Sequence, residues 1–148
     1  MKLYFKISLA AMLLMTVMTS CKKDKEQPTR RELLSKAPWI QTASSAVRQS
    51  DGATFDVFSG LAACKQDDAY TFAADNTFLQ MEGDTKCNTA DPQLILTGTW
   101  TFAADETAII VSAPGAGTST FTILELTGST LKMQVTQGGY VGTGTYRH

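Results

Sequence analysis

The sequence predicts an all-β domain that forms a closed antiparallel β-barrel of about eight strands. Three observations predict it: apolar and polar residues alternate over short segments, turn-forming residues recur between these segments, and one hairpin sequence occurs twice. About eight strands with short connections suit a sheet that closes on itself and leaves no exposed edge. A β-sandwich is the competing architecture, and the order of the hairpins favours the barrel.

The first residues have the organisation of a secretion signal. Lys2 and Lys6 supply positive charge, the run 7–20 is uncharged, and Cys21 follows directly. This run is shorter than the stretch of about 20 apolar residues that crosses a bilayer, and it contains several hydroxyl side chains. Residues 18–21 resemble the lipobox of bacterial lipoproteins, which implies cleavage after residue 20 and diacylation of Cys21. An ordinary signal with an incidental cysteine would instead leave an exposed, reactive thiol.

Removal of the predicted signal peptide 1–20 leaves 128 of the 148 residues, enough for one domain. Eleven basic and fourteen acidic side chains remain, a net charge of −3. No basic patch remains to favour nucleic acid as a partner. Residues 21–32 are largely charged or polar and are expected to form a flexible tether for a domain that spans residues 33–148. A diacylated Cys21 would hold this domain on a membrane.

The first predicted element of the domain is a short helix over residues 30–36. Thr29 and Glu32 have the spacing of a capping box, and Leu33 and Leu34 provide an apolar side to bury. After Pro38 the pattern changes from helix to strand. The expected strands are 39–48, 54–60, 68–73, 77–83, 97–103, 107–113, 118–126 and 129–137, and the glycine-rich segment 138–146 is a candidate ninth.

One hairpin sequence occurs twice, 30 residues apart. Residues 70–77 read Tyr-Thr-Phe-Ala-Ala-Asp-Asn-Thr, and residues 100–107 read Trp-Thr-Phe-Ala-Ala-Asp-Glu-Thr. In each copy an aromatic strand leads into a turn and a second strand follows, which predicts two similar hairpins of a meander. Alternation in 131–136 likewise directs Leu131 and Val135 to the core.

Cys64 and Cys87 form an even pair in a compartment where disulfides persist, and they predict one bridge. We expect this bridge to fasten the loop 84–92 to the barrel wall and to stabilise the fold by roughly 3 kcal/mol in the chain-entropy model. A metal site with two cysteines is the alternative. Because the only histidine is His148, the chain offers too few nitrogen and sulfur ligands for zinc. We therefore expect no metal and no cofactor.

Large aromatic residues at a spacing of two on strands are expected to fill the interior of the barrel. These candidates for the core are Trp39, Tyr70, Phe72, Trp100 and Phe102. The alternative is that they contact a ligand, because eight-stranded barrels range from filled to holding one small ligand.

The residue types argue against catalysis, and we expect that the protein is not an enzyme. A nucleophilic serine or cysteine would lack its commonest base, since the single histidine is the last residue. Two acidic pairs, Asp67-Asp68 and Asp105-Glu106, lie at predicted strand ends or turns. We interpret them as solvated turn residues, because a glycosidase needs two carboxylates that converge across a cleft.

Several short motifs, in their order along the chain, resemble the lipocalin-like domains of small Gram-negative lipoproteins. These motifs are Pro38-Trp39-Ile40, the strand 70–72 followed by Asp75-Asn76-Thr77, the strand Gly98-Thr99-Trp100, and the segment 123–131. The resemblance spans about residues 33–148. It implies an up-and-down barrel with a conical interior suited to a small apolar ligand, and it supplies neither a ligand nor binding residues.

Two functions of different classes follow. In the first, a membrane-anchored lipoprotein uses its barrel to bind a small apolar ligand. In the second, a filled barrel acts as an interaction module that contacts a protein or glycan partner in the cell envelope. In both, the lipid on Cys21 holds the protein at the outer membrane of a Gram-negative bacterium, facing the periplasm or the cell surface. A barrel interior that is open to an apolar probe would favour the first function.

Overall fold

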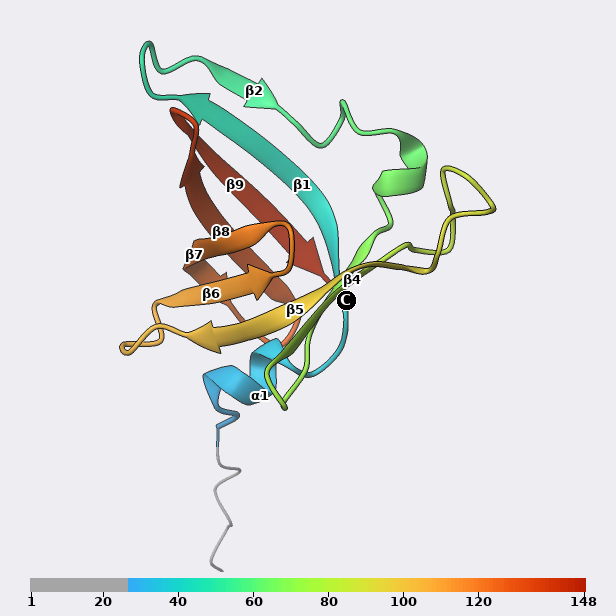
Figure 1. The fold of residues 1–148 in the computed structure, drawn as a ribbon. Helices are drawn as coiled ribbons and strands as arrows, with labels where there is room; N and C mark the ends of the chain where they lie inside the picture. Colours follow the sequence, from blue (N-terminus) through green and yellow to red (C-terminus); the bar gives the residue numbers. More distant parts are fainter. Residues whose placement is uncertain (1–26) are drawn as a thin grey trace, which may run out of the picture.

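The structure, a computed structural model, describes residues 27–148, which form an antiparallel sheet closed into a barrel (Figure 1). Cys21, the predicted signal peptide and most of the predicted tether lie outside these residues. Within them, no helix is long and apolar enough to cross a membrane. The elements are α1 (Arg30–Leu34), the 3₁₀ turn η1 (Ala63–Lys65), β1 (Trp39–Arg48), β2 (Thr54–Asp56), β3 (Ala69–Phe72), β4 (Thr77–Met81), β5 (Leu94–Phe102), β6 (Ala108–Ala113), β7 (Gly117–Leu126), β8 (Thr130–Gln137) and β9 (Tyr140–Arg147).

The pairing of the first strand with the last closes the barrel. Strands β3 to β9 pair in sequence order, and β9 returns to pair with β1 from Ile40 to Arg48. β2 pairs with β1 alone and stands outside this ring, so eight strands form the wall. The predicted eight-stranded barrel is therefore confirmed against the sandwich. The candidate ninth strand belongs to the wall, whereas the predicted strand 54–60 is reduced to β2.

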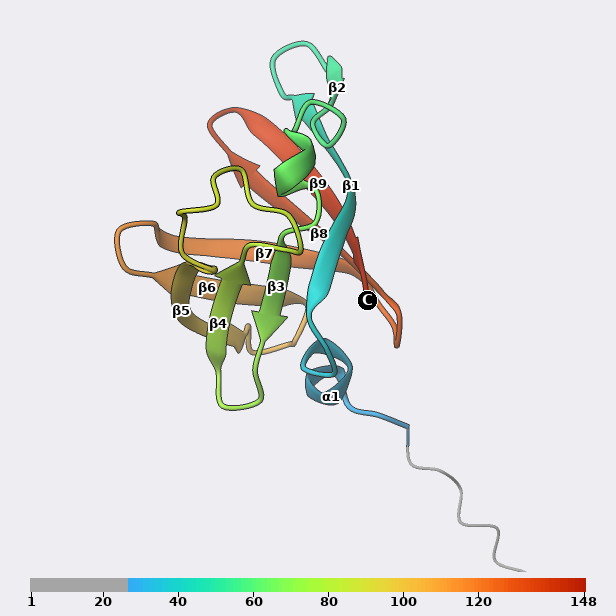
Figure 2. The same cartoon turned by 90° about the vertical axis from the view of Figure 1, so that its right-hand side faces the viewer.

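The wall is incomplete between β1 and β3. These two strands pair only through Trp39 and Ile40. Farther along β1, the same edge pairs with β2, and the carbonyl of Ser44 accepts hydrogen bonds from the backbone N–H groups of Val57 and Phe58. The connection 57–68, which contains η1, therefore borders this side of the barrel instead of a strand (Figure 2).

Helix α1 begins at the capping box that the sequence predicts. The Thr29 hydroxyl accepts a hydrogen bond from the backbone N–H of Glu32, and the Glu32 carboxylate accepts one from the backbone N–H of Thr29. Leu34 is fully buried at the other end of the helix. Residues 30–32, the end of the predicted tether, belong to this helix.

α1 and the short segment after it close one end of the barrel by contacting three hairpin turns. Arg31 donates a hydrogen bond of 2.7 Å to the side chain of Asn76 in the β3–β4 turn. Arg30 donates to the carbonyl of Glu106 in the β5–β6 turn, and Lys36 donates to the carbonyl of Gly128 in the β7–β8 turn. We call this the closed end; the opposite end, bordered by η1 and the β4–β5 and β8–β9 connections, is the open end (Figure 1).

The two copies of the repeated hairpin adopt the same turn. In the first copy the Asp75 carboxylate accepts a hydrogen bond from the Thr77 backbone N–H, and in the second Asp105 accepts one from Thr107. The residue before each threonine has a positive φ, 72° in one turn and 55° in the other. The predicted pair of similar hairpins is confirmed, and both turns lie at the closed end.

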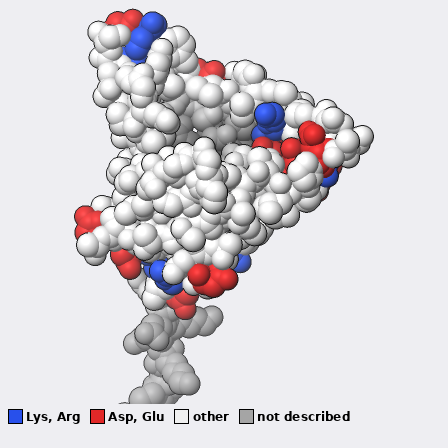
Figure 3. All heavy atoms as spheres, viewed as in Figure 1, with Lys and Arg blue, Asp and Glu red and all other residues white. Residues whose placement is uncertain are grey.

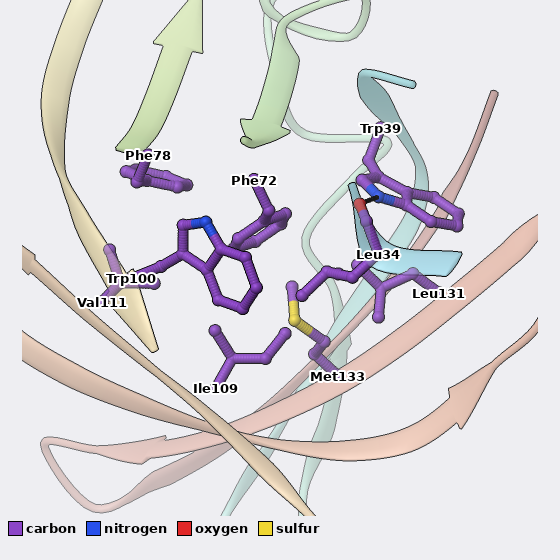
Figure 4. Packing of buried hydrophobic residues seen from close by; sticks show 9 residues of the cluster. All are labelled: Leu34, Trp39, Phe72, Phe78, Trp100, Ile109, Val111, Leu131 and Met133. Carbon is purple, nitrogen blue, oxygen red and sulfur yellow. Dashed lines mark hydrogen bonds between the residues drawn. The ribbon is translucent and has the colours of Figure 1, made fainter. Parts of the chain in front are cut away.

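The hydrophobic core occupies the half of the barrel near the closed end (Figure 4). The Trp39 indole N–H donates to the carbonyl of Leu34, and the Trp100 indole N–H donates to the carbonyl of Ala73, each at 2.8 Å. Both tryptophans are thus satisfied polar groups in an apolar interior. The buried members of the core are Leu34, Trp39, Phe72, Phe78, Trp100, Ile109, Val111, Leu131 and Met133.

Candidate functional site

The interior side chains become smaller toward the open end of the barrel. On β6 the residues that face inward change from Ile109 through Val111 to Ala113. On β9 the inward positions between Tyr146 and Tyr140 are Gly144 and Gly142, and these glycines border a cavity. Large side chains therefore fill one half of the barrel, and small ones leave the other half hollow.

One part of this space is a cavity of about 360 Å³, which we call the main hollow. Its wall is mostly apolar and includes Leu61, Phe121, Met133, Val135 and Tyr146. The volume lies at the lower end of the range that is usual for small-molecule sites, about 300–1,000 Å³. The main hollow can therefore accommodate a small apolar molecule.

Two smaller cavities adjoin the main hollow. The side hollow, about 250 Å³, shares Gln41 and Leu61 with the main hollow. A third cavity of about 170 Å³ shares Phe121 with the main hollow, and it shares Tyr70 and Gln80 with the side hollow. The shared lining residues make the three cavities neighbouring parts of one space at the open end.

Two tyrosines form the floor between the core and the hollow half. The rings of Tyr70 and Tyr146 meet edge to face, with their centres 5.5 Å apart, and the Gln41 amide donates a hydrogen bond to the Tyr146 hydroxyl. Burial is the main cause that raises the pKa of both phenols, with Asp68 adding to it at Tyr70. Both hydroxyls therefore stay protonated and can donate a hydrogen bond to a ligand.

The side hollow contains a buried carboxylate, where the sequence led us to expect a solvated turn residue. Asp68 is only 7% exposed, and its Oδ1 has no hydrogen-bond partner among residues 27–148. The prediction was wrong because Asp68 continues the alternation of Tyr70 and Phe72, so its side chain faces inward. The neighbouring Asp67 has the opposite orientation, and its Oδ2 accepts two hydrogen bonds of 2.8 Å from Thr85.

Burial raises the pKa of the Asp68 carboxyl, and the nearby charge of Glu82 raises it further. A raised pKa in the folded state means that Asp68 binds its proton more tightly when folded. Its contribution to stability is then greatest below its ordinary pKa of 3.8 and falls as the pH rises through the raised value. The Gln80 side chain lowers this pKa by hydrogen bonding, Asp67 raises it and Lys65 lowers it. Tyr70 is the remaining titratable neighbour in the side hollow.

Asp68→Asn should therefore gain stability relative to the parent protein as the pH rises from about 4 toward neutrality. Urea unfolding of both proteins at a series of pH values measures the difference between their free energies of unfolding. Taking the difference removes the contributions of the other carboxylates. A difference that does not change with pH would contradict the assignment of Asp68 as a buried carboxyl group whose ionisation destabilises the fold.

The predicted disulfide between Cys64 and Cys87 is present, with the two Cα atoms 5.1 Å apart. Cys64 lies in η1, within the connection from β2 to β3, and Cys87 lies in the β4–β5 loop. The bridge therefore joins two loops at the open end. The expectation that it would fasten a loop to the barrel wall was wrong, because the strand predicted before Cys64 ends early at Asp56.

The five aromatic residues predicted for the interior lie in the core or against it. Trp39, Phe72 and Trp100 are buried, and Tyr70 and Phe102 are partly buried and pack on the cluster. Of the five, Tyr70 borders the hollows described above.

Several residues that line the hollows were not singled out from the sequence. Gln80 and Glu82 follow Phe78 at a spacing of two on β4 and just beyond it, and they line the side hollow. Phe121 lines the main hollow from β7. Continuing the alternation outward from the core residues would have identified them. No group of three or more His, Cys, Asp or Glu side chains within residues 27–148 is placed to hold a metal ion.

Comparison with known proteins agrees with this barrel. The sequence profile of the family described as Lipocalin-like domain matches residues 38–133, from the start of β1 into β8. The chain belongs to this lipocalin-like family. The resemblance predicted from the sequence motifs is thus confirmed. A solved structure of a lipocalin-like protein from Bacteroides uniformis is 16% identical, with a TM-score of 0.49, over 78% of this lipocalin-like chain and 97% of that one. No curated protein matches.

Proposed function

We propose that this protein is a lipid-anchored lipocalin-like lipoprotein of the cell envelope that binds a small apolar ligand at the open end of its barrel. The observation that carries the proposal is the main hollow, which is about 360 Å³ in volume and is lined mostly by apolar side chains. In Figure 3 the surface is hollowed between the β1–β2 hairpin and the rest of the barrel; the surface to the left of this depression and below it is uncharged, and acidic and basic side chains lie along its right-hand edge. An apolar molecule gains about 25 cal/mol per Å² of its surface that leaves water there.

The position of the anchor is compatible with ligand entry. Cys21 precedes the described residues, and the described chain begins beside α1, which covers the closed end (Figure 1). A lipid on Cys21 would therefore tether the protein from the side opposite the hollows. The open end would face away from the outer membrane, toward the periplasm or the cell surface.

The hollow half of the barrel supports ligand binding over the alternative of a filled interaction module. A filled barrel would have large inward side chains along the whole length of each strand, whereas Gly142, Gly144 and Ala113 border the cavities here. The proposed role is binding and not catalysis.

The experiment that tests this proposal is native mass spectrometry of the full chain, expressed with its own signal in a Gram-negative host and released in mild detergent. We expect acylation of Cys21, a mass two hydrogens lower than that of the reduced chain, and a small bound molecule that reproducibly co-purifies. An unmodified Cys21 would contradict the anchor. An acylated chain that carries no molecule and takes up no apolar probe would contradict the binding role.

Filling the main hollow should weaken binding of an apolar probe. Val135→Trp places a large side chain in the hollow, and we expect it to weaken binding of N-phenyl-1-naphthylamine about tenfold or more, with little loss of stability. The matched control is Thr136→Trp, because Thr136 is exposed on the opposite face of β8. Fluorescence titration of each full chain with the probe, corrected for the signal in detergent alone, measures the affinity. Equal binding by both variants would place the probe outside the hollow.

A further inference from the structure

We propose that the ligand carries a cationic amine, and that Asp68 and Glu82 bind this group in the side hollow while its apolar part occupies the main hollow. This inference rests on the proposed function, since it assigns the chemical class of the ligand for the same site. Four observations carry it: the positions of the two carboxylates, their unsatisfied oxygens, the balance of charge around them, and the connection between the two hollows.

The pairing of β3 with β4 brings the two carboxylates together. Tyr70 lies opposite Gln80, and Ala69 lies opposite Met81. Continued by one residue, this register places Asp68 opposite Glu82, and the alternation directs both side chains inward. Both line the side hollow of about 250 Å³. The site is therefore built by paired backbone strands, with the carboxylates just beyond the last hydrogen-bonded pair.

Both carboxylates have a buried oxygen that lacks a hydrogen bond. Asp68 is 7% exposed, and neither its Oδ1 nor the Oε2 of Glu82 has a hydrogen-bond partner among residues 27–148. A buried carboxylate oxygen without a donor is unfavourable, because it has lost its hydration and gained nothing in exchange. The raised pKa of Asp68, caused by burial and by Glu82, agrees with this environment. An ammonium group supplies up to three N–H donors and the opposite charge.

The surrounding charges also favour a cation. Asp67 lies close enough to raise the pKa of Asp68, and the basic residue that lines the side hollow is Lys65, which is exposed. Lys65 forms no ion pair with either carboxylate within 4 Å, since the ion pair found in the described part of the chain joins Arg48 to Asp51. The side hollow therefore has an excess of negative charge that a bound ammonium group would compensate.

The side hollow and the main hollow can be occupied by one molecule. They share Gln41 and Leu61, so an amine held by Asp68 and Glu82 can extend its apolar part past these residues toward Phe121. Primary alkylamines and aromatic amines of moderate size have this shape. A molecule with a carboxylate head group would instead meet two carboxylates of the same charge.

The test compares octylamine, 1-octanol and octanoate, which share one chain length and differ in head group. Calorimetric titration of the full chain in one mild detergent at pH 7, corrected for detergent alone, gives the affinity of each. We expect octylamine to bind about tenfold or more tightly than 1-octanol, a difference of about 1.4 kcal/mol, and octanoate to bind most weakly. In Asp68→Asn/Glu82→Gln, octylamine and 1-octanol should bind alike, with the affinity for 1-octanol unchanged.

The matched control is Asp84→Asn, which removes one negative charge from an exposed position on the β4–β5 loop. It should keep the preference for the amine. If the parent chain binds octylamine and 1-octanol equally, or if the double variant keeps the preference, the amine site is wrong and the apolar hollow stands. If none of the three molecules binds, both the amine site and the proposed binding function are wrong.

Discussion

Replacing Trp100 by alanine should destabilise the fold by about 3–5 kcal/mol, the usual cost of truncating a fully buried large aromatic residue. The Trp100 ring meets Phe72 and Phe102 edge to face at 5.8 Å and 5.3 Å, and its N–H donates to the carbonyl of Ala73 in the β3–β4 turn. The Arg31 guanidinium lies 4.7 Å from the centre of the same ring. The substitution therefore weakens the core, one turn and the attachment of α1 together. Urea unfolding of the full chain, followed by far-ultraviolet circular dichroism, measures the loss.

Two further variants separate these contributions. Trp100→Phe keeps an aromatic ring but loses the hydrogen bond to Ala73, so its loss of stability should be intermediate. Phe55→Ala truncates an aromatic residue that is 41% exposed on β2, outside the barrel ring, and it should lower stability by less than about 1 kcal/mol. If Trp100→Ala were no more destabilising than Phe55→Ala, the closed end would not be the core of this domain.

The closed half of the barrel could be predicted from the sequence because its signals are local. Phe72 and Trp100 lie on strands that alternate clearly before the turn, and each strand leads into the same Ala-Ala-Asp-x-Thr turn. Thr29 and Glu32 likewise show the cap of α1 within four residues. Such patterns depend only on residues that are close in the sequence, so they can be recognised without knowing which strands pair.

The closure of the barrel could not be predicted with the same detail. The segments 54–60 and 138–146 both read as candidate strands, yet β2 stands outside the ring while β9 completes it. The difference depends on which edge of β1 each segment meets, and that edge is set by pairing between residues about 100 positions apart. Alternation indicates which face of the sheet each side chain occupies, but it gives no information about which other strand pairs with that strand.

The candidate site was missed for a different reason. Asp68 was grouped with Asp67 as a turn residue because two adjacent acids usually mark a solvated strand end. Asp68 lies two residues before Tyr70, so the alternation along this strand already indicated an inward side chain. Glu82 lies four residues after Phe78, and the same alternation directs it inward. The unsatisfied oxygens and the surrounding cavity follow only from the three-dimensional packing. The sequence could thus have indicated the inward carboxylates, but not that space remains beside them.

Removal of the disulfide should be the second large effect on stability. The double variant Cys64→Ser/Cys87→Ser is expected to lose about 3 kcal/mol, because a bridge across a sequence separation of 23 restricts the unfolded chain by about that amount in the chain-entropy model. For a domain of this size the melting temperature should fall by about 10 °C. Thermal unfolding of the full chain, with and without a thiol reductant, measures both effects. The reductant should lower the melting temperature of the parent and leave that of the double variant unchanged.

The same variant tests how the open end is organised. The bridge joins the two loops that border the side hollow, but Asp68 and Glu82 lie next to the paired ends of β3 and β4. If the strand ladder positions the carboxylates, the double variant should still prefer octylamine to 1-octanol at a temperature where it remains folded. Loss of the preference in the folded variant would instead mean that the bridged loops position the two carboxylates in the side hollow. A melting temperature equal to that of the parent would contradict the stabilising role of the bridge, since the loss expected from the unfolded chain does not depend on any contact at the open end.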